Sequence, residues 1–181
     1  ANYNGQKGLD LNGDKKADTN WQEINLAWTK GFHSFFNDLR KNKGNNFTII
    51  ANPGNLSYKE VDGKQFENFP YQYHNLGGKN NWEVNMMIAK KYQIAVINPD
   101  DKDFLLGAVT ALMLDNAYLA VGQNQAYHDY YKLDLGRALD KTKEISKGIW
   151  SRKFEKGKIF VDTNKGNKAW VEYKDGSKKE K

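Results

Sequence analysis

Residues 127–163, YHDYYKLDLGRALDKTKEISKGIWSRKFEKGKIFVDT, contain the clearest change of pattern in the chain. Apolar residues recur on both sides of the turn sequence Glu-Lys-Gly at 155–157, namely Trp150, Phe154, Ile159 and Val161. Apolar residues alternating around a glycine-containing turn are typical of a β-hairpin. We therefore expect a small antiparallel β appendage over residues 148–181, with strands at 149–154, 158–162 and 168–173.

Upstream of this stretch, strand and helix patterns alternate. Apolar residues at helical spacing predict a helix over 20–41, with Thr19 or Asn20 as its N-cap. Further helices are expected at 80–91 and 103–114, and strands at 6–11, 47–51, 64–69, 94–97 and 118–121. Strands that alternate with helices indicate βαβ units and a parallel sheet. We expect an α/β body over residues 1–147 with at most five parallel strands.

Composition narrows the class of protein. The chain has 181 residues, of which 39% are hydrophobic and 13% aromatic, so it is globular. Its net charge of +6 is scattered, without a basic stripe, so we expect no nucleic-acid partner. The absence of cysteine excludes disulfides and thiolate metal sites. No apolar run reaches the roughly 20 residues of a membrane helix, and a start at Ala1 suggests processing or a fragment.

The segment DLNGDKKAD at residues 10–18 has the spacing of a calcium loop. Oxygen ligands occupy relative positions 1, 3, 5 and 9, at Asp10, Asn12, Asp14 and Asp18. The turn glycine and the final glutamate of an EF-hand are missing, and Glu23 could take the latter's place. A structural Ca²⁺ is one interpretation, and an Asp-rich turn without an ion is the other.

Carboxylates follow several of the expected strands. Glu67 lies in FENFP at residues 66–70, and a carboxyl group among aromatic side chains suits a general acid. A glycosidase needs two such groups, and Asp10 is the second candidate, in competition with calcium. The simpler interpretation is that Glu67 caps the next loop. We interpret Asp115 as part of the turn that ends a helix.

Polar and aromatic residues near the same strand ends could contact a sugar. These candidates are Asn52, Tyr127, Asp129 and His74, the last within the aromatic loop YQYHN at residues 71–75. Asn52 precedes a proline, so turn geometry alone also explains it. The three histidines have no HExxH spacing, and no GxSxG elbow or phosphate loop is present, which disfavours zinc and serine hydrolases.

Five short segments together resemble a family of glycoside-hydrolase-like (β/α) barrels. They are LDLN near Asp10, IIANPG, FENFP, LMLDNAYLAVG and DLGRAL followed by WSRKFEKGKIFVDT, and they run from about residue 8 to residue 161. The resemblance implies a partial (β/α)8 TIM-barrel-like body, its C-terminal part, with a β-hairpin tail. It also implies Asp10 and Glu67 as the catalytic pair and a polysaccharide or oligosaccharide as the ligand.

The length of the chain conflicts with a complete barrel. Such barrels typically have about 250 residues and eight strands. We therefore expect a second polypeptide or another copy to complete the barrel. A non-catalytic sugar-binding or structural protein with a calcium-stabilised loop is the alternative. The compartment stays open, with an extracellular or cell-surface location favoured.

Overall fold

The computed structural model describes residues 10–11, 13–52, 59–70, 80–120 and 127–180. The chain divides into two compact units, residues 1–62 and 63–181. Within the described ranges, none of the helices combines the length and hydropathy that crossing a lipid bilayer requires. The strand predicted over 6–11 lies largely outside the described residues.

The first unit is dominated by α1 (Trp21–Lys43). The side chain of Asn20 accepts a hydrogen bond from the N–H of Gln22 (3.0 Å), so Asn20 is the N-cap, one of the two residues predicted. Gly44 ends the helix with φ 84°, a conformation that favours glycine. Ile24 and Phe36 are the buried residues of this helix.

The strand predicted over 47–51 is shorter in the structure, where β1 covers Ile50–Ala51. The preceding residues bond to α1 and to residues 60–62 instead of to a strand. Arg40 donates to the carbonyls of Phe47 and Glu60 and to the Asp62 carboxylate, and Asp62 also accepts from the N–H of Ile49 (2.7 Å). Burial by itself would raise the pKa of Asp62, but the hydrogen bonds from Arg40 and from the N–H of Ile49, together with the charge of Arg40, outweigh it and lower that pKa.

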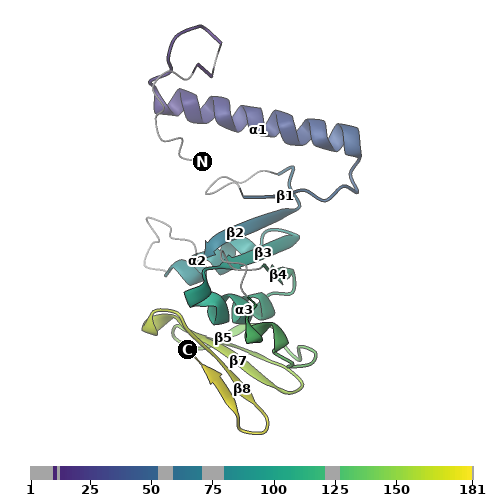
Figure 1. Ribbon diagram of the computed structural model, residues 1–181, viewed down its shortest axis with the longest axis vertical. Coiled ribbons are helices and arrows are strands. Elements are labelled where there is room, and N and C mark those ends of the chain that lie inside the picture. Colours follow the sequence, from purple (N-terminus) through teal and green to yellow (C-terminus); the bar gives the residue numbers. More distant parts are fainter. Residues whose placement is uncertain (1–9, 12, 53–58, 71–79, 121–126, 181) are drawn as a thin grey trace. The chain divides into compact units, whose positions relative to one another are not determined.

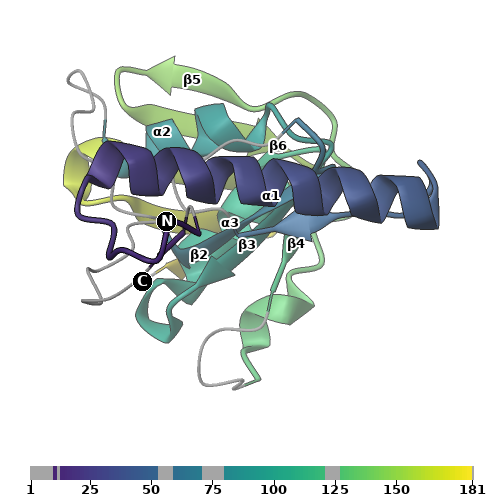
Figure 2. The same ribbon diagram turned by 90° about the horizontal axis from the view of Figure 1, so that it is seen from above.

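A parallel sheet forms one layer of the second unit. It contains β2 (Gly63–Phe69), β3 (Ile94–Pro99) and β4 (Ala117–Leu119), with β3 parallel to both neighbours (Figure 2). α2 (Asn81–Ala89) and α3 (Phe104–Met113) connect these strands. The α/β class is therefore confirmed, whereas three parallel strands are described in this unit and the prediction was up to five.

The two faces of this sheet differ in character. Phe66 on β2 and Ile97 on β3 are register partners and are buried on the helix side. The next pair along, Glu67 and Asn98, therefore lies on the opposite face, because side chains alternate along a strand. Tyr118 on β4 is 64% exposed and shares this second face with its register partner Val96.

An antiparallel sheet of five strands in sequential order forms the other layer of this unit. Its strands are β5 (Lys143–Ser146), β6 (Ile149–Lys153), β7 (Gly157–Asp162), β8 (Lys168–Tyr173) and β9 (Lys178–Glu180). The three predicted strands are present, and β5 and β9 were missed. Both are polar and mostly exposed outer strands, so they lack the apolar alternation that identifies a strand.

α3 lies between the two sheets (Figure 1). Its buried residues include Phe104, Leu105 and Val109, and buried side chains of both sheets join them in one core. Trp82 of α2 is fully buried there and donates to the Thr110 hydroxyl (2.8 Å). The core therefore continues from Phe66 to Val171 across the boundary that the sequence predicts at residue 147.

Candidate active site at the carboxyl ends of the parallel strands

Glu67 and Asn98 lie side by side at the carboxyl ends of β2 and β3. They are register partners, and the register shifts immediately after Glu67, where Asn68 has φ 52°. Glu67 is exposed, whereas the Oδ1 atom of Asn98 is buried and accepts no hydrogen bond from the described residues. A buried acceptor next to an exposed carboxylate at a strand end is typical of a functional site.

An aspartate and a histidine meet just beyond β3. Asp101 begins the short 3₁₀ helix η1 (Asp101–Asp103), and its Oδ1 atom lies 3.4 Å from Nε2 of His128. The His128 ring stacks on Phe104, the first residue of α3, with centroids 3.8 Å apart and planes at 16°. This stacking fixes the plane of the imidazole and keeps it beside the Asp101 carboxylate, at a distance where the two atoms form a charge contact and no hydrogen bond.

The segment after His128 lies at the same edge. It forms η2 (Asp129–Lys132), in which the Tyr131 hydroxyl lies 3.4 Å from the carbonyl of Ala120, just beyond β4. Tyr131 also packs edge-on against Phe104 at 5.0 Å, and partial burial raises the pKa of its phenol. Tyr127 is 65% exposed and lies 5.8 Å from Tyr131, leaving an open aromatic surface.

The structure places three of the predicted residues at this edge of the sheet. Glu67 lies near the carboxyl end of β2, and Tyr127 and Asp129 lie at the start of the segment that is anchored beyond β4. Asp101 was missed, although Asn-Pro-Asp-Asp directly after a buried strand was a signal that could have found it. An exposed carboxylate and a second carboxylate beside a histidine, next to an open aromatic ring, are groups that suit acid–base chemistry.

The other predicted residues lie elsewhere. Asp10 and Asn52 belong to the first unit, and Asn12 and His74 lie outside the described residues. The Asp10 carboxylate accepts hydrogen bonds from three backbone N–H groups of its own loop, at residues 13, 14 and 15 (2.6–3.1 Å). Asp115 does follow α3 as predicted, and it pairs with Arg152 and Lys141.

The loop predicted to bind calcium forms hydrogen bonds to its own backbone. Besides the bonds to Asp10, the Asp14 carboxylate accepts from the N–H of Lys16 (2.9 Å) and that of Asp18 from Leu11 (2.6 Å). Among the residues that the structure describes, no three acidic or histidine side chains are grouped as metal ligands. The described side chains therefore give no positive indication of an ion, and Asn12 is not among them.

These features define an α/β protein whose candidate acid–base groups lie at the carboxyl edge of a parallel sheet. The family model GHL15, described as hypothetical glycosyl hydrolase family 15, matches residues 1–158. The chain belongs to this family, which confirms the resemblance found in the sequence. No curated protein matched the chain.

Proposed function

We propose that the chain forms part of a (β/α)-barrel glycoside hydrolase acting on a polysaccharide or oligosaccharide, with Glu67 as general acid. The observation that carries this proposal is the register pair Glu67 and Asn98 at the carboxyl ends of β2 and β3. Catalytic groups of such barrels lie at this end of the strands. The description of the matched family supports the reaction type.

A glycosidase needs a second carboxyl group, and two candidates remain. Asp10 was chosen from the sequence, and its carboxylate bonds to its own loop. Asp101 lies beyond β3, the strand adjacent to that of Glu67, and contacts His128. A loss of activity in Asp101→Asn with activity retained in Asp10→Asn would assign the role to Asp101, and the reverse would assign it to Asp10.

Substrate contacts would come from the polar and aromatic groups around Glu67. Tyr127 offers an open ring, with the Lys132 ammonium 5.4 Å from its centroid, and Asp129 offers a carboxylate in the adjoining turn. Asn52 and His74 are retained as proposed contacts from the sequence. Aromatic rings stack on the apolar faces of sugars while neighbouring polar groups bond the hydroxyls.

The test is the release of reducing ends from a panel of soluble polysaccharides. Glu67→Gln keeps the shape of the side chain but removes the proton donor, so we expect activity to fall by about 10²–10⁴-fold. Asp38→Asn, which changes an exposed carboxylate of α1 in the same way, is the control. A Glu67→Gln protein that hydrolyses the substrate as fast as the parent would refute the assignment.

The exposed face of the parallel sheet supports a partner that completes the barrel. Gln65 and Tyr118 join Glu67 and Asn98 on the face opposite the helices, and none of the four is buried. In a closed barrel this face would point inward and be filled by side chains of the remaining strands. Native mass spectrometry should find a second polypeptide or another copy, and a lone monomer would contradict this.

The alternative proposal is a non-catalytic sugar-binding or structural protein whose loop at residues 10–18 holds a structural Ca²⁺. The Asp10, Asp14 and Asp18 spacing supports it. It predicts that sugars bind without being hydrolysed. It also predicts that a chelator lowers the melting temperature.

A further inference from the structure

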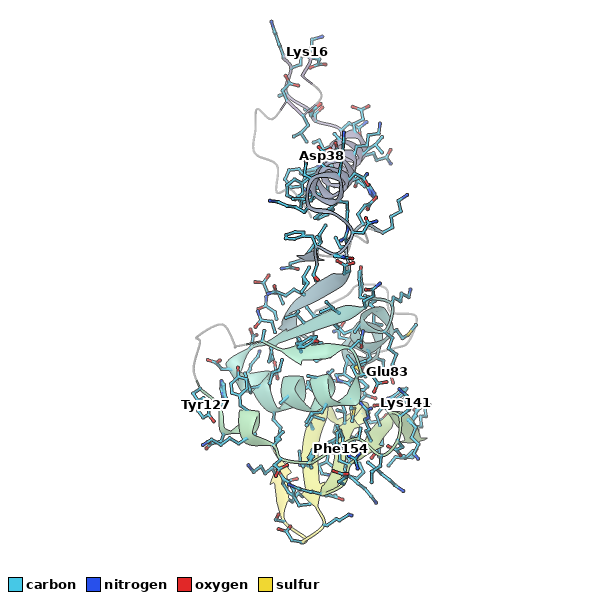
Figure 3. All side chains as sticks on the ribbon, turned by 90° about the vertical axis from the view of Figure 1, so that its right-hand side faces the viewer. Lys16, Asp38, Glu83, Tyr127, Lys141 and Phe154 are labelled. Atoms are coloured by element: carbon cyan, nitrogen blue, oxygen red, sulfur yellow. The ribbon has the colours of Figure 1, made fainter. Side chains whose placement is uncertain are left out.

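A groove of 620 Å³ runs along α2 in the second unit. Residues of α2, including Glu83, Met87 and Lys90, line one wall, and Glu144 and Lys147 from β5 and the following turn line the other. Figure 3 shows Glu83 and Tyr127 on opposite sides of this unit. The groove shares no lining residue with the candidate active site around Glu67, Asn98 and Asp101, called the strand-edge site below. A ligand in the groove would therefore be a separate one.

Hydrogen bonds between its walls hold the groove open. The Asn80 side chain, which caps α2, donates to the Thr163 carbonyl (3.1 Å) and to Oδ1 of Asn167 (2.6 Å). The Asn164 side chain donates to the carbonyl of Lys147 (2.9 Å). These bonds tie the start of α2 and the β5–β6 turn to the β7–β8 connection. A ligand would therefore enter a site that needs little ordering, which favours binding.

The lining combines an aromatic floor with a charged rim. Trp150 is half-buried and packs on the buried Trp82 with ring centroids 5.8 Å apart, next to Met86. The rim carries two carboxylates, Glu83 and Glu144, and two ammonium groups. One oxygen of Glu144 accepts from the N–H of Gly148 (2.6 Å), which leaves the other for a ligand.

The charges of the rim favour a neutral ligand. Lys90 and Lys147 form no ion pair within the ranges that the structure describes. The positive charges of the two lysines and the negative charges of Glu83 and Glu144 cancel. The local field therefore favours the binding of neither an anion nor a cation. Groups that donate and accept around an indole floor match the hydroxyls and the apolar ring face of a sugar.

We propose that this groove is a second carbohydrate-binding site, which takes one or two neutral sugar residues of a glycan chain. Its volume lies within the roughly 300–1,000 Å³ of small-ligand pockets. The groove, its lining and their match to a sugar stand independently of the proposed function, and only the role of the groove rests on it. Its role is to hold a glycan chain while the strand-edge site acts on another part of it.

Methionine methyl NMR of the full chain tests this directly. The chain has three methionines, of which Met86 and Met87 line the groove. Met113 is 2% exposed, lies outside the groove and serves as an internal reference. Cellotetraose, maltotetraose and chitotetraose are titrated separately to about 10 mM, which detects millimolar affinities. We expect at least one to shift the Met86 and Met87 signals while Met113 stays in place.

Variants separate the two sites. The double variant Lys90→Ala with Lys147→Ala should weaken this binding by at least about tenfold, as expected for the loss of charged hydrogen bonds. Lys41→Ala with Lys43→Ala, two exposed lysines at the end of α1, should leave it unchanged. Glu67→Gln should also leave it unchanged, even where hydrolysis is lost.

Several outcomes would overturn the proposal. They are the absence of shifts with all three sugars, equal shifts of Met113, full binding by the Lys90 and Lys147 double variant, and loss of the shifts in Glu67→Gln. The last would place the ligand at the strand-edge site. A protein that hydrolyses no polysaccharide but shows the specific methionine shifts would contradict the proposed function and leave the groove proposal intact.

Discussion

Arg152 connects the end of α3 to the antiparallel sheet, and its removal tests how the second unit is held together. Its side chain is 7% exposed. The guanidinium donates to the carbonyls of Asp140 and Leu112 (2.9 Å each) and to the Asp115 carboxylate (2.5 Å), and it lies 5.6 Å from the Phe154 ring centroid. The substitution Arg152→Met keeps the apolar stem and removes all of these donors.

The magnitude follows from the contacts. A hydrogen bond from a charged donor contributes about 1.5–3 kcal/mol, so the two carbonyls account for about 3 kcal/mol at the lower value. The cation–π contact adds about 0.5–1 kcal/mol. Asp115 is 53% exposed, so water replaces much of its bond and we count none of it. We expect Arg152→Met to lower the free energy of unfolding by about 3–4 kcal/mol.

Urea unfolding followed by tryptophan fluorescence measures this change, read from the midpoint at constant slope. Arg137→Met is the matched control, because Arg137 pairs with Glu155 but its side chain is 88% exposed. We expect a far smaller shift there, since solvent screens exposed ion pairs. Equal shifts for the two variants would refute the argument that the buried bonds of Arg152 stabilise the unit.

Acid stability gives a second readout of the same contact. Hydrogen bonds from Lys141 and then Arg152 lower the pKa of Asp115 below its ordinary value of 3.8. A carboxyl group whose pKa is lower in the folded state than in the unfolded state stabilises the fold fully at pH values above its unfolded-state pKa. This stabilisation is lost as the pH falls through the folded-state pKa. Asp115→Asn should therefore lower the free energy of unfolding at pH 6, and this effect should become progressively smaller below about pH 4. A pH-independent effect would contradict the linkage.

Three further predictions concern single sites. Thr110→Val leaves the buried Nε1–H of Trp82 without its acceptor, so urea unfolding should show a loss of about 1–3 kcal/mol; a neutral effect would mean that this donor finds another acceptor. Gly148→Ala places a Cβ 2.5 Å from the Asn164 side chain at φ 72°, so the melting temperature should fall, and an unchanged value would show that the turn relaxes freely. If the loop at residues 10–18 binds Ca²⁺, a chelator should lower the melting temperature and Asp10→Asn should abolish that response; identical curves with and without chelator would exclude a structural ion.

Local signals in the sequence identified most elements of the fold. Helical spacing and caps located α1, α2 and α3 within a few residues, and the turn at 155–157 predicted the pairing of β6 with β7. Elements without an apolar pattern were not predicted. The polar strand β5 is defined by its hydrogen bonds to β6, and such pairing leaves no trace in hydrophobic periodicity.

The candidate site was only partly predictable for a related reason. Glu67 and Tyr127 were predicted because each stands in a distinctive local sequence context. Asp101 was not, because its significance comes from His128, which is distant in sequence and lies 3.4 Å away in the fold. The stacking of His128 on Phe104 likewise depends on how η2 packs against the start of α3.

The sequence by itself determined the alternation of strand and helix, the antiparallel C-terminal sheet and the family. These properties depend on the types of residues and on their spacing over short stretches of the sequence. The tertiary structure alone decided that α3 packs between two sheets, that Glu67 faces away from the core beside Asn98, and that α2 and the β5–β6 turn enclose a groove. Each of these depends on contacts between residues far apart in the chain, which sequence spacing does not specify.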